Sequence, residues 1–359
     1  SKVDNDMVKM NFVKLLATIV LSSLLVCHTC AFALSPHRGT NAVPRSEPNL
    51  GRRHHPTKPH YVDLMTRFRG GDSTTTSLSL AVTDLVVATQ SALKAGPWGI
   101  VALSGIASSV VVPLTMIRQG YSFSVGYGFS VFAMGLALFQ TFSIGISKSS
   151  LSLLSLAVMF YGARLGSFLL LREWTVPSKA EQIKSFDKSS RLARIPLAVS
   201  VAIFYAFETS PLLYAARAAI GNTNVVMNTG VGLAWLGAVL EALADGQKFA
   251  IKMKRNGMEG TSEDTFVGPT GGCYRLCRHP NYFAEVLFWF GLLVSGIPSF
   301  GKSPIAWGCS ILGFYGIFGI MSKATERLDG KQKEKYEGQE KYDSYVKEVT
   351  APIWPWSSS

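Results

Sequence analysis

The chain is organised as long hydrophobic runs separated by short polar segments. Most runs are close to the roughly 20 apolar residues that a transmembrane helix needs. The sixth run is shorter and is bounded by glycine and proline, so we expect six or seven spans. The pattern predicts an all-α, polytopic transmembrane helix bundle, with residues 78–94 as an additional interfacial helix. The runs are 98–117, 123–146, 150–171, 196–220, 224–244, 282–297 and 303–321.

The basic residues between the runs predict one orientation in the membrane. Segments after the first, third, fifth and seventh runs hold 20 Lys and Arg residues, whereas those after the other three hold only Lys148 and Lys302. Positively charged loops remain on the cytoplasmic side. We therefore expect loops 172–195 and 246–281 and the C-terminal tail to meet at one face, toward the cytosol or, in a plastid, the stroma.

Composition agrees with a membrane protein and argues against other classes. The 359 residues are 48% hydrophobic and only 16% charged, which is too apolar for an ordinary soluble enzyme. The net charge of +12 lies in loops and tails, without a basic stretch interleaved with aromatics, so no nucleic-acid partner is expected. The chain has no GxGxxG or GxxxxGK(S/T) fingerprint, so any cofactor must bind between the helices. The expected partners are membrane lipids and a hydrophobic small molecule, and no oligomeric state is predicted.

The N-terminal region is predicted to be a targeting sequence. Residues 1–34 contain a basic start, an apolar core from Leu15 to Val26 and a small-residue exit, as in a signal peptide. Residues 35–75 are rich in arginine and proline and look like a disordered transit peptide, which leaves 76–359 as the membrane domain. The Ala31-Phe32 junction resembles the motif that joins these two signals in algae with secondary plastids, such as diatoms. We expect a plastid membrane, with the endoplasmic reticulum as the alternative.

Residues 275–289, RLCRHPNYFAEVLFW, place polar residues at the start of an apolar, membrane-length run. If a helix begins near Pro280, then Arg278, Tyr282 and Glu285 share one face. Free N–H groups at a helix start attract anions, so this segment predicts a phosphate or carboxylate site. The alternative is a snorkelling arginine beside a capped helix start. The candidate binding residues are Arg275, Arg278, His279, Asn281, Tyr282 and Glu285.

His279 is the only histidine after His60. Cys27 and Cys30 fall in the predicted leader, and the remaining Cys273, Cys277 and Cys309 offer no paired C-x-x-C spacing. A metal centre in the membrane domain is therefore not expected. His279 is expected to hydrogen-bond a ligand or to transfer a proton, unless it is purely structural.

A second polar group follows the fifth run, in LEALADGQKFAIKMK. Glu241, Asp245, Lys248 and Lys252 are spaced by four, three and four residues, which places them on one helical face. Salt bridging along the helix explains the spacing, but Glu241 is expected at membrane depth, where charge is costly. We assign Asp245 and Lys248 to the ligand.

Two further ionisable residues are expected inside the membrane. Arg164 and Glu208 are interpreted either as a pair between helices or as functional groups. In the second case Glu208, together with Tyr205 one turn earlier, is a candidate catalytic acid for a substrate carbonyl or alkene. The tail after the seventh run predicts an amphipathic helix whose Tyr342 and Tyr345 fold back over the pocket.

Four segments in order, RLGSFLLLRE, EALADGQK, CRHPNYFAEVLFWFG and TERLDGKQKEKYEGQEKYDSYV, resemble the family of the steroid 5-alpha-reductase C-terminal domain. The likeness covers roughly residues 100–356. The wider superfamily, with the sterol reductases, contains membrane enzymes that use NADPH to reduce carbon–carbon double bonds.

The resemblance implies NADPH as cofactor and an isoprenoid or sterol-like lipid as substrate. It implies cofactor contacts at Asp245 and Lys248 and across the RHPNYxxE segment, with Tyr342 and Tyr345 in a closing element. Ala284 replaces the glycine usual before Glu285. The family's catalytic Glu and Tyr have no unambiguous counterpart, and Glu208 and Tyr205 are assigned to those roles.

Two alternatives share this architecture. Isoprenylcysteine carboxyl methyltransferases and phospholipid methyltransferases carry a related RHPxYxG segment and bind S-adenosylmethionine. The other alternative is a lipid-binding membrane protein without catalysis. The Asp245-x-x-Lys248 element before the loop favours the reductase.

Overall fold

The computed structural model describes residues 73–218, 224–256 and 265–355. The predicted signal peptide and most of the predicted transit peptide lie outside these residues. The chain divides into two compact units, 1–89 and 90–359; of the described residues, 73–89 belong to the first unit and all others to the second.

The described residues form helices and contain no strand, which confirms the all-α prediction. Short 3-10 turns occur at η2 (Gln119–Phe123), η3 (Leu192–Arg194) and η4 (Gly272–Arg275). The α-helices are α3 (Ser73–Lys94), α4 (Gly99–Ile117), α5 (Val125–Thr141), α6 (Ser150–Thr175), α7 (Pro177–Lys184), α8 (Ile195–Ala218), α9 (Val225–Asn256), α10 (Pro280–Phe300), α11 (Pro304–Tyr336) and α12 (Glu340–Glu348).

Six of these helices are long and apolar enough to cross a membrane: α4, α6, α8 (with η3), α9, α10 and α11. The second predicted run, 123–146, forms α5, which is apolar but only 17 residues long. The prediction of six or seven spans is therefore confirmed. Local sequence explains two of the starts, because Pro280 and Pro304 occupy the first turns of α10 and α11, where a missing N–H costs nothing.

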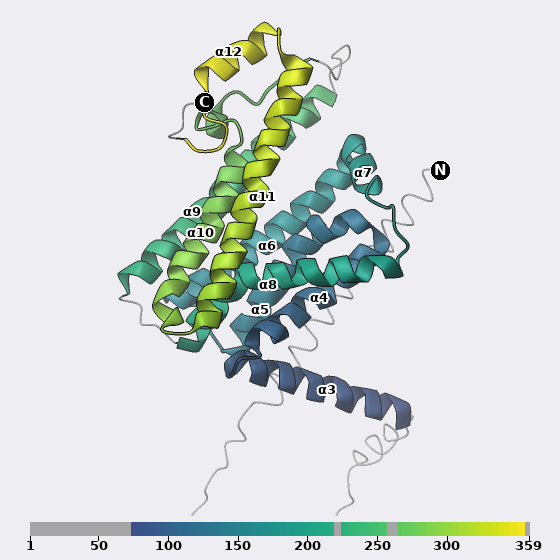
Figure 1. The fold of residues 1–359 in the computed structure, drawn as a ribbon, viewed down its shortest axis with the longest axis vertical. Helices are drawn as coiled ribbons and strands as arrows, with labels where there is room; N and C mark the ends of the chain where they lie inside the picture. Colours follow the sequence, from purple (N-terminus) through teal and green to yellow (C-terminus); the bar gives the residue numbers. More distant parts are fainter. Residues whose placement is uncertain (1–72, 219–223, 257–264, 356–359) are drawn as a thin grey trace, which may run out of the picture. The chain divides into compact units, whose positions relative to one another are not determined.

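Helices α9, α10 and α11 lie side by side in Figure 1, and α9 and α10 form the most extensive packing of the fold. Gly237 and Gly291 make this close approach possible. A Cβ at Gly237 would lie 2.7 Å from the carbonyl oxygen of Ala284, and one at Gly291 would lie 2.7 Å from that of Gly230. Ala284 is fully buried at this crossing. The polar residues at the start of α10 are thereby held against the polar C-terminal end of α9.

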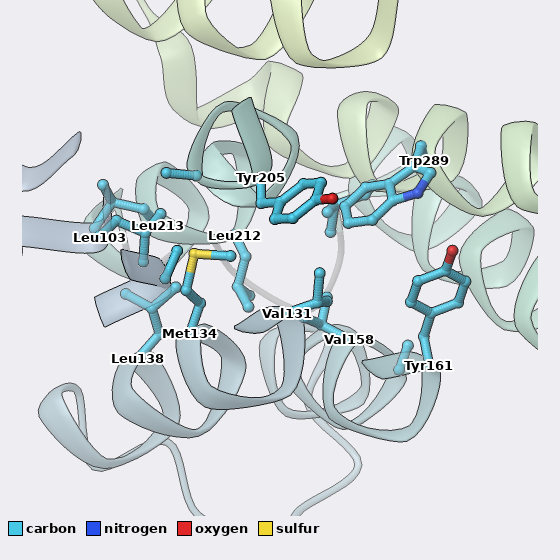
Figure 2. Close-up of a cluster of buried hydrophobic side chains, with 14 of the residues drawn as sticks. Leu103, Val131, Met134, Leu138, Val158, Tyr161, Tyr205, Leu212, Leu213 and Trp289 are labelled. Atoms are coloured by element: carbon cyan, nitrogen blue, oxygen red, sulfur yellow. The ribbon is translucent and has the colours of Figure 1, made fainter. Parts of the chain in front are cut away.

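A second group of helices, α4, α5, α6 and α8, surrounds the apolar core. In Figure 2, the core side chains Leu103, Met134 and Leu138 lie at one end of the cluster, and Tyr161 and Trp289 lie at the other. The core therefore changes from aliphatic to aromatic and polar along its length.

Helix α11 extends well beyond a bilayer. Its 33 residues span about 50 Å, against a hydrocarbon thickness of about 30 Å. The first part of the predicted amphipathic stretch thus continues α11 as far as Tyr336. Gly338, with φ of 88°, follows the end of α11, and the amphipathic C-terminal helix is α12.

Candidate functional site

A cavity of about 460 Å³ lies between α6, α9, α10 and α11, at the end where η2, the 265–275 segment and α12 meet. Its volume is in the range of small-molecule sites. The three polar segments that the charge pattern placed at one membrane face all contribute to the lining. Lys179 comes from the 172–195 segment, Phe266 from the 246–281 segment and Tyr345 from the C-terminal tail.

One face of α9 runs along the cavity. Glu241, Asp245, Lys248 and Lys252 all line it, as their spacing predicted. Eleven residues of helix separate the first from the last, or about 16 Å. The two acids stand at the membrane-embedded end and the two lysines stand toward the polar face.

Three carboxyl groups gather at the inner end of the cavity: Glu241 and Asp245 from α9, and Glu285 from α10. Arg164 of α6 pairs with two of them, at 2.9 Å from Glu241 Oε1 and 2.8 Å from Asp245 Oδ2. Glu208 is not its partner, so the predicted Arg164–Glu208 pair is wrong. The reason is packing, since α6 lies against α9 far more than against α8.

Tyr127 of α5 joins this inner end to the aromatic core. Its hydroxyl donates to Glu285 Oε1 at 3.1 Å and accepts from Trp289 Nε1 at 2.8 Å. The hydroxyl of Tyr161 lies 3.3 Å away. Tyr127 and Glu285 both line the cavity, so this hydrogen-bonded pair borders its inner end.

The mouth of the cavity is basic. Cations come from α6, α7, α9 and α11, and no acidic side chain of the described residues lines this outer part. Burial, together with the nearby positive charges of Arg172, Lys252, Lys248 and Lys331, lowers the pKa of Lys179 to about 8. A concentration of positive charge of this kind favours an anionic ligand. Besides Arg278, the cationic lining residues are Arg172, Lys179, Lys248, Lys252, Lys331 and Lys335, and these six form the basic mouth.

Arg278 lines the cavity, but most of its hydrogen bonds hold the protein together. Its guanidinium donates to Asp329 of α11 at 2.7 Å and to the carbonyl oxygens of Val349 and Thr350. The backbone N–H of Arg278 donates to Ala351 O at 3.0 Å. This residue therefore anchors the C-terminal segment to the start of α10.

His279 is fully buried behind this anchor, with Nε2 at 2.6 Å from Asp329 Oδ1. Burial lowers the pKa of His279, and the hydrogen bond with Asp329 partly opposes that effect. The imidazole is therefore neutral near pH 7, and Nε2 is assigned as the donor to the carboxylate.

The roof over the mouth is aromatic. Tyr345 of α12 lines the cavity and donates from its hydroxyl to Tyr274 O at 3.0 Å. Tyr342 lies outside the lining and packs its ring 5.2 Å from that of Phe266. Phe266 and Tyr336 line the cavity with ring centroids 5.4 Å apart, which provides aromatic faces beside the cations.

The two predicted catalytic residues lie outside the cavity lining. Tyr205 donates its hydroxyl to Ser122 O at 2.7 Å and packs its ring 4.6 Å from that of Tyr127. Glu208 is 3% exposed, and neither of its carboxyl oxygens has a hydrogen-bond partner. Both residues are next to the inner end rather than in it.

The structure thus brings most of the predicted binding residues together around one cavity. Asp245, Lys248, Arg278, Asn281, Tyr282, Glu285 and Tyr345 line it. Arg275, which is exposed on η4, does not, and neither do His279 and Tyr342.

Sequence reasoning missed several residues of the site. Tyr127 and Tyr161 are surrounded by apolar residues, and no periodicity marks a buried phenol. Asp329 sits in the TERLDGK segment that carried the resemblance, so that motif was the available signal. Lys179 and Lys331 looked like ordinary loop and helix-surface charges.

The described residues of this region do not indicate a metal-ion site or a reactive thiol. No group of His, Cys, Asp and Glu suited to a metal ion occurs in the described part of the chain. Burial raises the pKa of the Cys277 thiol to about 11, so it stays protonated at neutral pH.

Comparison with known protein families matches residues 119–349 to the model of DUF1295, described as a protein of unknown function. The match covers more than half of the chain. The chain belongs to the DUF1295 family. This family is part of the steroid 5-alpha-reductase-like superfamily, in agreement with the resemblance seen in the sequence. No curated protein and no solved structure matches the chain. The DUF1295 match begins at η2 and ends just after α12, so it includes every element that lines the cavity.

Proposed function

We propose that this protein is an NADPH-dependent membrane reductase that saturates a carbon–carbon double bond in an isoprenoid or sterol-like lipid. The observation that carries the proposal is the basic mouth of the cavity, with six cationic side chains contributed by four helices. Phosphate groups are the ligands that such a cluster binds best.

The residues present fit this cofactor. NADPH carries several phosphate groups for the basic mouth and an adenine ring for the aromatic faces of Phe266 and Tyr336. Asn281 lines the cavity with a buried Oδ1 that has no hydrogen-bond partner, and this atom suits an N–H donor of the ligand. When bound, the cofactor supplies a hydride.

The chain supplies the proton. Tyr127 presents the fixed hydroxyl at the inner end, and we assign it as the catalytic acid. One carbon of the double bond receives the hydride and the other receives the Tyr127 proton. The phenolate left behind regains a proton from water that enters through the polar mouth, while Glu285 accepts the hydrogen bond of the restored Tyr127 hydroxyl and holds it in place. On this proposal Tyr205 and Glu208 are positioning residues that act through Tyr127, because neither reaches the cavity.

The lipid enters from the membrane side. The inner part of the cavity is lined by the apolar side chains of Leu165, Leu169 and Met321 as well as by the acids. A hydrophobic substrate is therefore brought against Tyr127 within the bilayer, while the phosphates remain at the polar face.

The main alternative is an S-adenosylmethionine-dependent methyltransferase of the isoprenylcysteine or phospholipid type. The acidic inner end of the cavity favours it, because three carboxyls suit a sulfonium cation. S-adenosylmethionine has no phosphate group, however, and leaves the basic mouth unexplained. A lipid-binding protein without catalysis, the third candidate, leaves both ends unexplained.

Thermal unfolding of the purified protein with each ligand separates these candidates. NADPH is expected to stabilise the protein, by about 2.7 kcal/mol at a concentration of 100 times Kd. S-adenosylmethionine is expected to leave the unfolding temperature unchanged. Stabilisation by S-adenosylmethionine alone assigns the methyltransferase, and stabilisation by neither favours the lipid-binding protein.

Two lysines of α11 provide a matched pair for the same assay. Lys331 lines the mouth, whereas Lys323 is exposed two turns earlier and does not. Lys331→Gln is expected to weaken NADPH binding about tenfold, since a charge-assisted hydrogen bond is worth roughly 1.5–3 kcal/mol. Lys323→Gln is expected to bind as the wild type does. If the two variants bind NADPH equally well, the basic mouth is not part of the cofactor site.

The reaction is tested by lipid profiling of a strain that lacks the protein. An unsaturated precursor is expected to accumulate, and expression of the wild type restores the saturated product. Tyr127→Phe is expected to fail in this rescue while still binding NADPH, whereas Tyr315→Phe, on an exposed tyrosine of α11, restores the product. Full rescue by Tyr127→Phe would refute its role as the acid.

The proposed location is a plastid membrane, on the strength of the Ala31-Phe32 junction. A fluorescent protein fused behind residues 7–75 and expressed in a diatom is expected to enter the plastid. Retention in the endoplasmic reticulum would assign the alternative.

A further inference from the structure

The inner end of the cavity has an excess of acid over base. Glu241, Asp245 and Glu285 are 2%, 8% and 7% exposed and line the same cavity. Within the described residues, Arg164 is the cation in contact with this group, and it pairs with Glu241 and Asp245. Arg172 and Lys248 also act on Asp245, from beyond ion-pair distance. Among the described residues, Arg164 is thus the one cation paired with this group, and Glu285 has no ion pair.

Glu241 also keeps an unused acceptor atom. Its Oε1 pairs with Arg164, but Oε2 is buried and has no hydrogen-bond partner. The remaining carboxyl, that of Glu285, receives its hydrogen bond from the neutral hydroxyl of Tyr127. A buried acceptor without a donor is costly, and so is a buried carboxylate without a counter-charge. A ligand that brings positive charge to this point relieves both costs.

The mouth is basic and the inner end is acidic, and this difference in charge determines which end of a ligand lies at each end of the cavity. Along α9 the side chains change from Glu241 and Asp245 to Lys248 and Lys252 over about 16 Å. A ligand with phosphates at one end and a cationic ring at the other complements this gradient along its whole length.

We propose that these three carboxyl groups make the site prefer the oxidised, cationic form of the dinucleotide to the reduced, neutral-ringed form. The inference rests on the proposed function, because it takes the nicotinamide ring as the inner end of the ligand. The mouth contacts the same phosphates in both forms, so a difference in affinity reports the inner end. Glu241, Asp245 and Glu285 are then specificity-determining residues, and turnover is sensitive to the ratio of NADP+ to NADPH.

The test compares the dissociation constants of NADP+ and NADPH for the full-length purified protein by isothermal titration calorimetry. The wild type is expected to bind NADP+ roughly three- to thirtyfold more tightly. Glu241→Gln is expected to bring the ratio of the two constants close to one. Its fold is expected to survive, because Asp245 still pairs with Arg164. Glu285→Gln, on a different helix and paired with Tyr127 instead, is the second variant and is expected to lower the ratio as well.

Lys331→Gln is the control at the other end. It is expected to weaken the binding of NADP+ and of NADPH by the same factor, so the ratio of the two dissociation constants stays unchanged.

Three results would overturn the inference while the proposed function stands: equal affinities in the wild type, a preference for NADPH, or a wild-type ratio in both Gln variants. Binding of neither form would instead reject the cofactor itself, and the proposed function with it.

Discussion

At the scale of single residues, the site depends on charges that the fold holds in unfavourable surroundings. Lys179 is crowded by other cations at the mouth, and Asp329 satisfies both Arg278 and His279 behind it. An anionic ligand would relieve the repulsion at the mouth, whereas the ion pairs of Asp329 are already formed without a ligand. Substitutions at the two positions should therefore have different consequences, one in binding and the other in stability.

Ligand binding is expected to depend on pH through Lys179. Its pKa in the protein is about 8, and an anion raises it again, so binding takes up a proton above that pH. Affinity for NADPH should fall as pH rises from about 8 toward the ordinary lysine value near 10.4, by up to about tenfold for each pKa unit recovered. The groups that face Lys179 are Arg172 on α6, Lys248 and Lys252 on α9 and Lys331 on α11.

Lys179→Arg provides the comparison, since an arginine stays charged throughout this range. Titrations at several pH values should show a flatter profile in this variant. An identical pH profile in the wild type and Lys179→Arg would show that another group controls binding.

Asp329→Asn is expected to lower the free energy of unfolding by about 1–3 kcal/mol, because it leaves Arg278 and His279 without their shared carboxylate. Thermal unfolding in detergent measures the change. Glu326→Gln, on an exposed position of the same helix, is expected to unfold as the wild type does. A wild-type unfolding temperature for Asp329→Asn would show that this anchor contributes nothing to stability.

At the scale of helices, the sequence predicted the elements well and their ends less well. The run 196–220 corresponds to Ile195–Ala218, and 282–297 corresponds to Pro280–Phe300. Hydropathy ended the fifth run at residue 244, yet α9 continues to Asn256. The extension carries Asp245, Lys248 and Lys252 and is amphipathic rather than apolar, so a hydropathy criterion cannot include it.

The packing where α9 and α10 cross is expected to be the part of the structure that larger side chains destabilise most. Gly237→Ala places a Cβ against the backbone of Ala284 and Phe288, and it should destabilise the protein by roughly 1–3 kcal/mol. Gly232→Ala on the same helix meets open space and should be neutral or slightly stabilising. Unfolding measurements that rank the two variants in the reverse order would refute this account of the crossing.

At the scale of the whole molecule, charge asymmetry predicts that all cavity-lining loops share one side of the membrane. A cysteine introduced at Ser190, in the segment before η3, and one introduced at Lys302, between α10 and α11, are both at exposed positions. In sealed vesicles, in a background without the native cysteines, an impermeant thiol reagent should label only one of them from a given side. Labelling of both from the same side would contradict the predicted topology.

The sequence by itself determined the membrane-embedded helical fold and the polar faces of α9 and α10, and it predicts the orientation of the loops. These follow from local properties: a span needs an apolar run, a loop needs charge, and side chains four residues apart share a face of a helix.

Tertiary structure alone decided which charges meet. Arg164 was free to pair with any buried acid until the packing of α6 on α9 brought it to Glu241 and Asp245. Tyr127 had no distinguishing pattern until α5 placed it beside Glu285 and Trp289. Such contacts join residues more than 70 positions apart, and their distances depend on how helices cross, which no local periodicity encodes.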